Sequence, residues 1–326
     1  MYQFIPSQRR QLATLVAISC LGLSASAQAG IISSLYTEAT AQAGNTAAYT
    51  QSSGTQTDSA YSTANQSTDT NFSYSNSFGH NNGSGGTSYA ASASGQGIFS
   101  STGSFLKTLT ITNDASYAQT YSLSYYMYAG NLNIGGNYGY VAGDTGSASL
   151  SFLIYENLAS PLLQRTAALS LAADGSISTQ NDGFNISSNG SWLSTGIESG
   201  SLSLGVLAAG ATKTIYYSLV AQALGNYAWQ PGGLGDGDWQ CGYGADGNYE
   251  CGYGLGYGHA GESSAFLGDP DDIDGWGYQN GYGWGTPHPM TVTSQAYNSV
   301  PLPGTLALVG LGLLGLGIKH RKRSIQ

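Results

Sequence analysis

The feature that most constrains the fold is a two-residue alternation of apolar and small polar side chains that recurs between residues 98 and 229. Because successive side chains of a strand point to opposite faces, each such run predicts a strand with one buried face. Turn clusters such as Ala173-Asp174-Gly175 separate the runs. The sequence therefore predicts a mostly β fold, an antiparallel β-sandwich of jelly-roll-like type with long Gly/Tyr/Ser-rich loops. Two of the runs are Ala148, Leu150, Phe152, Ile154 and Ile215, Tyr217, Leu219, Ala221.

Residues 30–97 have a different composition, dominated by Ser, Thr, Asn, Gln, Ala and Gly, with few large aliphatic residues after Leu35. Such a segment is compatible with a disordered linker. It is also compatible with edge strands, because Tyr74, Tyr89 and the Ser/Ala alternation near residue 92 suit an extended chain. We interpret the region as partly ordered strands with long flexible loops.

The first 29 residues have the three parts of a secretory leader. Arg9 and Arg10 precede the apolar run 12–23, and Ala27-Gln28-Ala29 supplies the small residues of a cleavage site. A signal helix over 1–29 and a mature chain starting at Gly30 are expected. A twin-arginine leader and a lipoprotein cysteine at Cys20 are the weaker alternatives.

The C-terminal residues 300–326 also have three parts. A proline-containing motif opens the segment, the uncharged stretch 304–318 follows, and a basic cluster closes it at 319–323. The uncharged stretch predicts a single transmembrane helix whose basic flank stays in the cytoplasm. A buried core helix is the alternative, but the segment has no polar face. The motif is Val300, Pro301, Leu302, Pro303, and the cationic residues of the cluster are Lys319, Arg321, Lys322, Arg323.

This tripartite tail resembles the PEP-CTERM sorting signal of Gram-negative bacteria that make exopolysaccharide. Leu302 stands where the namesake motif has Glu, so the tail is similar to a Val-Pro-Leu-Pro variant. The resemblance implies export through the inner membrane and processing of the tail by an exosortase. Envelope anchoring or release to the cell surface follows from it, with exopolysaccharide as a partner.

The charge distribution excludes one class of partner. All eighteen acidic residues lie between Glu38 and Asp274, where the basic residues are Lys107, Arg165 and Lys213 alone. A surface so poor in cations cannot neutralise phosphates, so nucleic-acid binding is not expected.

Within the predicted sandwich domain, residues 98–299, a Gly/Tyr/Asp-rich excursion spans 229–285 and contains a short duplication. Each copy carries one cysteine, Cys241 and Cys251. In an exported chain a disulfide between them is the expectation. A zinc site is the alternative, but it needs two further ligands, and His259 is the nearby candidate.

Two binding sites are conceivable in the excursion. Clustered carboxylates can hold calcium, although the EF-hand spacing is absent and a solvated acidic turn is the favoured explanation; the residues are Asp269, Asp271, Asp272, Asp274. Aromatic faces beside polar groups can hold sugar rings, although such rings also pack on one another; the candidates are Trp239, Tyr243, Tyr249, Trp276.

Catalysis is not expected, because the chain has neither a nucleophile-elbow nor a metalloprotease motif. A carboxylate pair such as Glu250 and Glu262 leaves a glycoside hydrolase as the least favoured reading. The sequence favours a non-catalytic structural protein of the envelope surface or of an exopolysaccharide biofilm matrix. The alternative is a carbohydrate-binding sandwich, with or without calcium.

Overall fold

The computed structural model describes residues 30–81, 87–135, 139–156, 160–230, 239–243, 249–253, 260–268 and 291–297, and in 239–243 and 249–253 it describes the backbone only. The regular elements of these residues are all strands, and their pairings are antiparallel. The prediction of a mostly β, antiparallel fold is confirmed, and the arrangement is consistent with a β-sandwich.

The first sheet has seven strands in the order β11-β10-β9-β15-β6-β1-β2. Strand β6 is central, since it pairs with β15 along its whole length and with β1 along nearly all of it. The strands are β1 (Gly30–Ala43), β2 (Tyr49–Ser52), β6 (Ile98–Thr112), β9 (Thr145–Tyr155), β10 (Pro161–Leu171), β11 (Ile177–Asp182) and β15 (Thr212–Asn226).

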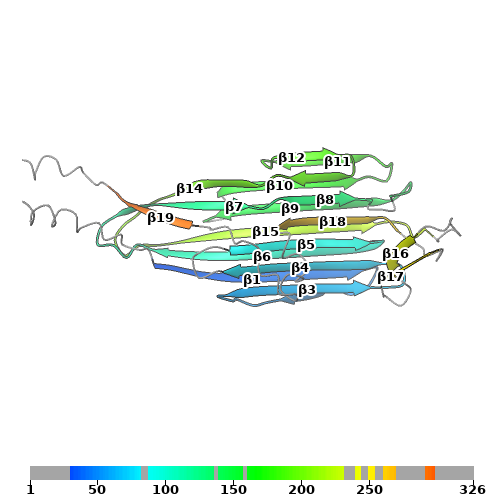
Figure 1. Ribbon diagram of the computed structural model, residues 1–326, viewed down its shortest axis with the longest axis horizontal. Coiled ribbons are helices and arrows are strands. Elements are labelled where there is room, and N and C mark those ends of the chain that lie inside the picture. The colour runs from blue at the N-terminus through cyan, green and yellow to red at the C-terminus, as the bar shows by residue number, and fades with distance from the viewer. Residues whose placement is uncertain are drawn as a thin grey trace, which may run out of the picture.

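The second sheet also has seven strands, in the order β12-β13-β8-β18-β5-β4-β3, and packs face to face on the first (Figure 1). Its strands are β3 (Ser59–Ser67), β4 (Phe72–Asn81), β5 (Thr87–Gln96), β8 (Gly130–Ile134), β12 (Ile186–Asn189), β13 (Trp192–Thr195) and β18 (Glu262–Gly268). Because β1 and β6 share one sheet while β5 and β18 share the other, residues 30–97 are built into both layers of the sandwich.

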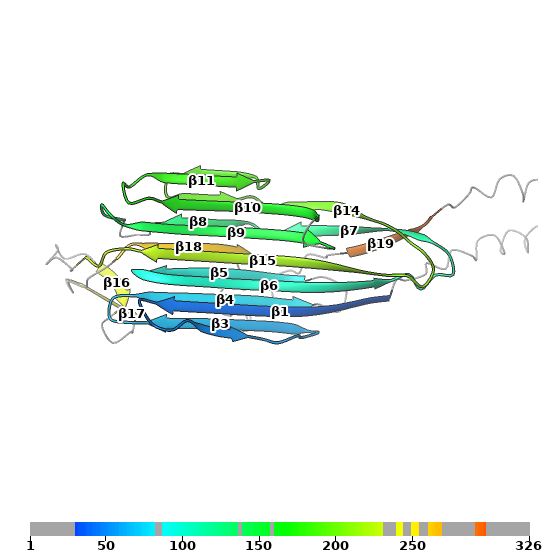
Figure 2. The same ribbon diagram turned by 180° about the vertical axis from the view of Figure 1, so that it is seen from behind.

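Two smaller sheets complete the described chain. The third has the order β14-β7-β19, with β7 (Gln119–Met127), β14 (Glu198–Leu207) and β19 (Thr291–Ala296). The fourth is a hairpin of β16 (Trp239–Tyr243) and β17 (Tyr249–Tyr253). Figures 1 and 2 show the third sheet at one end of the elongated molecule and the hairpin at the other.

The sheets approach closely where β1, β4 and β6 face one another, because small side chains fill the interface. The buried residues of β1 include Ala39 and Ala41, and β4 buries a row of serines. The Ser75 hydroxyl donates to the Thr40 carbonyl of the opposite sheet at 2.9 Å. The Ser77 hydroxyl likewise donates to the Glu38 carbonyl at 3.0 Å. Each hydroxyl is thus satisfied inside the sandwich, where an unpaired one would be costly.

Gly103 on β6 shows how little space this interface contains. A Cβ atom at this position would lie 2.4 Å from the Asn76 carbonyl oxygen and 2.5 Å from that of Ser92. Face-to-face sheets usually lie about 10 Å apart, with room for two layers of large side chains. Here glycine lets the main chains of β6 and the second sheet approach without such a layer.

Large side chains fill the middle of the sandwich instead. The rings of Tyr89 and Phe105 stack with centroids 5.5 Å apart, and Phe152 meets Tyr217 edge to face at 4.7 Å. The Tyr217 hydroxyl donates to the Tyr89 hydroxyl at 2.7 Å. Burial raises the pKa of both tyrosines, Tyr89 and Tyr217, above the ordinary value, so they remain protonated donors at physiological pH.

The two ends of the sandwich differ in which chain segments meet there. Residue Gly30 lies opposite Thr112, and Tyr297, which follows β19, donates its backbone N–H to the Ala118 carbonyl at 3.0 Å. We call this end, with the loops 113–118 and 208–211, the tail pole. The opposite end, where β6 begins at Ile98 and β15 ends at Asn226, is the distal pole. Fourteen residue steps along β6 place the two poles roughly 45–50 Å apart.

Candidate binding site

An open pocket of about 360 Å³ lies at the distal pole, where four segments of the chain converge. The turn before β4, the start of β6, the turn before β9 and the segment after β15 each contribute residues. The lining is Thr70, Asn71, Ile98, Ala142, Gly143, Asp144, Asn226, Tyr227, Ala228 and Trp229.

Asp144 holds two walls of this pocket together. Its carboxylate accepts the Ala228 N–H at 2.8 Å through Oδ1 and the Val141 N–H at 2.8 Å through Oδ2. The side chain is buried, and both of its oxygens are engaged by main-chain donors. Asp144 therefore positions the segment that carries Trp229 and the turn 141–144.

Asn71 and Tyr227 fix the remaining walls. The Asn71 Oδ1 atom accepts the Ile98 N–H at 2.7 Å, and its amide donates to the Thr68 hydroxyl at 2.9 Å. The Tyr227 hydroxyl pairs with the Ser263 hydroxyl at 2.5 Å, and burial raises the pKa of Tyr227. The pocket is thus preformed by groups that are already hydrogen-bonded.

The surface that remains for a ligand combines apolar and amide groups. Trp229 is 36% exposed and Ile98 is 48% exposed, and Asn226, which also lines the pocket, is an exposed residue with an amide side chain. A flat ring beside a hydrogen-bonding amide matches the apolar face and hydroxylated edge of a sugar. The arrangement suits a neutral, hydroxyl-rich ligand.

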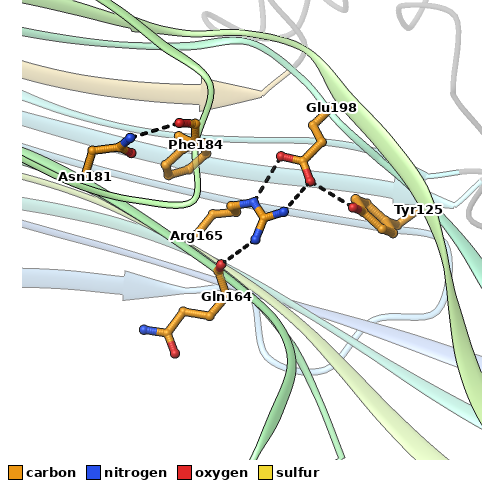
Figure 3. Close-up of polar contacts among 6 residues, drawn as sticks. All are labelled: Tyr125, Gln164, Arg165, Asn181, Phe184 and Glu198. Atoms are coloured by element: carbon orange, nitrogen blue, oxygen red, sulfur yellow. Dashed lines mark hydrogen bonds and ion pairs between the residues drawn. The ribbon is translucent and has the colours of Figure 1, made fainter.

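A second polar cluster joins the first and third sheets away from this pocket (Figure 3). Arg165 of β10 binds the Glu198 carboxylate of β14 through Nε at 3.0 Å and Nη2 at 2.6 Å. The Tyr125 hydroxyl of β7 donates to Glu198 Oε1 at 2.9 Å. The hydrogen bond from Arg165 holds the pKa of Glu198 below its ordinary value, whereas burial and the neighbouring carboxylate raise the pKa of Tyr125. The cluster links strands across the sandwich and keeps Glu198 ionised.

The comparison with protein families concerns the other end of the chain. The model of the PEP-CTERM protein-sorting motif matches residues 299–322. The chain carries a PEP-CTERM sorting motif. Its predicted resemblance is confirmed, and the motif implies export and envelope sorting through exosortase, a membrane enzyme that processes such tails. The search of curated proteins returned no significant match.

Much of what the sequence predicted for this chain lies outside the described residues. This holds for the signal segment 1–29, for the sorting tail 300–326, for Trp276 and for the four aspartates between 269 and 274. Within the described part of the chain, no helix is long and apolar enough to cross a membrane. The same part contains no group of three or more His, Cys, Asp or Glu residues arranged to hold a metal ion.

The predicted cysteine pair lies on the hairpin, where backbone register can be read. Cys241 on β16 is directly opposite Cys251 on β17. Trp239 is opposite Tyr253, and Tyr243 opposite Tyr249, so three of the four aromatic candidates share this ladder. The two carboxylates considered for hydrolysis are in different sheets, Glu250 on β17 and Glu262 on β18.

Asn71, Asn226 and Asp144 were not singled out from the sequence as site residues. Their signal is weak, because an Asn or Asp in a polar connecting segment usually marks a turn. Only the folded chain brings residues 70–71, 142–144 and 226–229 to one pocket. Trp229 was recognisable as an aromatic residue at the start of the excursion, but the residues that line the pocket with it could not be predicted from the sequence.

Proposed function

We propose that this PEP-CTERM protein is a non-catalytic structural component of the envelope surface or of the exopolysaccharide matrix around the cell. The observation that carries the proposal is the separation of the poles. The last described strand, β19, ends at the tail pole, whereas the β16–β17 hairpin lies at the other end (Figures 1 and 2). The pocket lies at the distal pole as well. A molecule held by its tail then presents the distal pole away from the membrane.

Deletion of residues 300–326 tests this proposal in the producing bacterium. We expect the truncated protein to move from the envelope fraction to the medium and the biofilm to lose cohesion. A matched control replaces Lys319–Arg323 with the same number of lysines and arginines in another order, which keeps the charge. Unchanged fractionation and unchanged biofilm texture after the deletion would contradict the proposed role.

A second candidate function, binding of a neutral polysaccharide, is favoured by the partly exposed Trp229, which lines the pocket together with Asn226. Trp229→Ala should weaken binding to the exopolysaccharide of the producing cell by about 5- to 150-fold, since stacking pairs and their burial contribute about 1–3 kcal/mol. Trp192→Ala is the control, because Trp192 is 41% exposed but does not line the pocket. Equal binding of both variants would exclude the pocket.

Whether calcium contributes to polysaccharide binding, and whether the aromatic residues of the excursion do, is tested separately. Binding measured with and without a chelator tests whether Asp269, Asp271, Asp272 and Asp274 contribute through calcium. Loss of binding in Trp239→Ala, Tyr243→Ala, Tyr249→Ala or Trp276→Ala would extend the sugar surface beyond the pocket. Chelator-insensitive binding would remove calcium from the proposal.

The hairpin also supports a disulfide between Cys241 and Cys251. Residues directly opposite in antiparallel strands have Cα atoms about 4.5–5.5 Å apart, within the range that a disulfide bridges. Mass spectrometry of the exported protein should find the two cysteines unavailable to alkylation until a reductant is added. Immediate alkylation of both would exclude the bond.

A further inference from the structure

The tail pole exposes large apolar and aromatic side chains that neither the sorting motif nor the pocket uses. Ile32 is 71% exposed, Ile31 46%, Tyr117 46%, Val206 47% and Tyr297 48%. Exposed apolar residues are individually unremarkable, but several gathered on one end of a molecule mark an interaction surface.

Backbone contacts place these residues around one loop. Tyr117 belongs to the loop 113–118, and the Tyr297 backbone N–H donates to Ala118 of the same loop. At the first residue of β1, a Cβ atom on Gly30 would lie 2.7 Å from Asp114 Oδ2, which places Ile31 and Ile32 beside the loop as well. Val206 on β14 is paired with Thr120 on β7. The neighbouring residue of β7, Gln119, is paired with Ala296 on β19.

The loops of this pole carry little charge that would oppose an apolar contact. Asp114 is the one charged residue in 113–118 and 208–211. Tyrosine combines an apolar ring with a polar hydroxyl, and this is why it is enriched at the interface between membrane and water.

The segment between Tyr297 and the expected membrane-spanning stretch is short, and this keeps the tail pole close to the bilayer. Six residues, 298–303, separate Tyr297 from the uncharged stretch that starts at residue 304. Fully extended, six residues span at most about 21 Å. With the uncharged stretch in the bilayer, the tail pole cannot move farther than this from the membrane surface.

We propose that the tail pole docks on the lipid bilayer through Ile31, Ile32, Tyr117, Val206 and Tyr297 while the tail is uncleaved. The inference rests on the proposed anchoring of the tail in the membrane. Docking holds Val300–Pro303 at the bilayer surface, where the membrane-embedded exosortase works, and directs the long axis of the sandwich away from the membrane. The distal pole then stands roughly 45–50 Å farther out.

Two tryptophan substitutions test the docking in the full-length chain reconstituted into phosphatidylcholine vesicles. Ile32→Trp reports on the tail pole, and Ile98→Trp is its matched control at the distal pole, since both isoleucines are exposed. Bromine on the upper acyl chain quenches a nearby indole. An interfacial residue sits about 5–10 Å into the boundary of headgroups and acyl chains, so the fluorescence added by Ile32→Trp should fall by about half or more. That added by Ile98→Trp should not change.

The other outcomes separate this inference from the proposed function. If the protein sediments with vesicles but neither added indole is quenched, the tail anchors the chain and the docking is wrong. Quenching of both indoles would mean that the sandwich lies flat, which also overturns the proposal. If the protein does not sediment with vesicles, both the membrane anchoring and the docking fail. Each variant is first shown to unfold at the wild-type urea concentration, so a loss of fold cannot imitate any of these results.

Discussion

Lys107 is a lysine inside the sandwich, 1% exposed, on the inward face of β6. Its ammonium donates to the Thr87 hydroxyl, which in turn donates to Asn81 Oδ1 at 3.2 Å. Burial lowers the pKa of Lys107 from the ordinary 10.5 to about 8. The folded protein therefore carries a poorly hydrated positive charge at neutral pH.

The energetic consequence follows from this difference in pKa. A pKa lower by about 2.5 in the folded state corresponds to about 3 kcal/mol of lost stability at pH 7, where the lysine is charged in both states. Between pH 8 and 10.5 the unfolded chain binds more protons at this position than the folded one. Stability should therefore rise with pH, by about 2 kcal/mol between pH 7 and 9.5.

Lys107→Met removes the charge and keeps an unbranched side chain of similar length. We expect the variant to be about 2–3 kcal/mol more stable than the wild type at pH 7, because Thr87 keeps its bond to Asn81. The gain should shrink to about 1 kcal/mol at pH 9.5, where most folded wild-type molecules have a neutral lysine.

Urea unfolding followed by tryptophan fluorescence at pH 7, 8, 9 and 9.5 measures both quantities. The series stops below pH 10, because the raised pKa values of Tyr89 and Tyr217 make stability fall as the pH rises past 10. Lys213→Met is the control: Lys213 forms a half-exposed ion pair with Glu156, and such pairs contribute about 0–1 kcal/mol. A Lys107→Met variant that is less stable than the wild type and keeps its pH dependence would refute the reasoning.

Three further substitutions have defined outcomes in the same unfolding assay. Gly103→Ala should cost at least about 1–3 kcal/mol, because its methyl group meets main-chain oxygens, while Gly196→Ala should be nearly neutral. Asn113→Ala should cost about 2–4 kcal/mol, since the buried amide satisfies carbonyls of both tail-pole loops. Glu198→Gln should cost about 1 kcal/mol or less at neutral pH. The difference in stability between the wild type and Glu198→Gln should be complete above the ordinary pKa of glutamate. It should disappear as the pH falls through the lowered pKa of Glu198. A variant that is more stable than the wild type, where a loss of stability is expected, would contradict the contact assigned to that residue.

The strands whose inward-facing side chains are large and apolar were predictable from the sequence. The run from Ala148 to Ile154 lies within β9, and that from Ile215 to Ala221 within β15, with the expected side chains buried. Alternation suffices there because an apolar residue at every second position gains from burial only when the chain is extended.

Residues 30–97 were harder to interpret because their inward-facing side chains are small. In β1 the buried positions are Leu35, Thr37, Ala39, Ala41 and Ala43. This is also a two-residue period, but alanine buries little apolar area and threonine is mostly found at the surface, so hydropathy alone does not reveal it. The strands are recognisable only once the close approach of the facing sheet is known.

The pocket could be predicted even less, since its residues come from four separate segments. Nothing in the local sequence of Asp144 indicates that Ala228, 84 residues later, supplies one of its hydrogen bonds. Pairings at such separation are fixed by the order of strands in a sheet. That order was not encoded in any single motif.

The pairing of β19 has a mechanical consequence for the proposed anchoring through the tail. Strand β19 runs toward the tail pole and is paired with β7 over six residue pairs, from Thr291 with Ser124 to Ala296 with Gln119. A force transmitted through the residues after Tyr297 acts along this strand, so the ladder is loaded in shear. All of its hydrogen bonds then resist together, whereas a force across the strand would open them one at a time. Under the proposed anchoring, this pairing therefore resists a pull along the strand better than a pull across it.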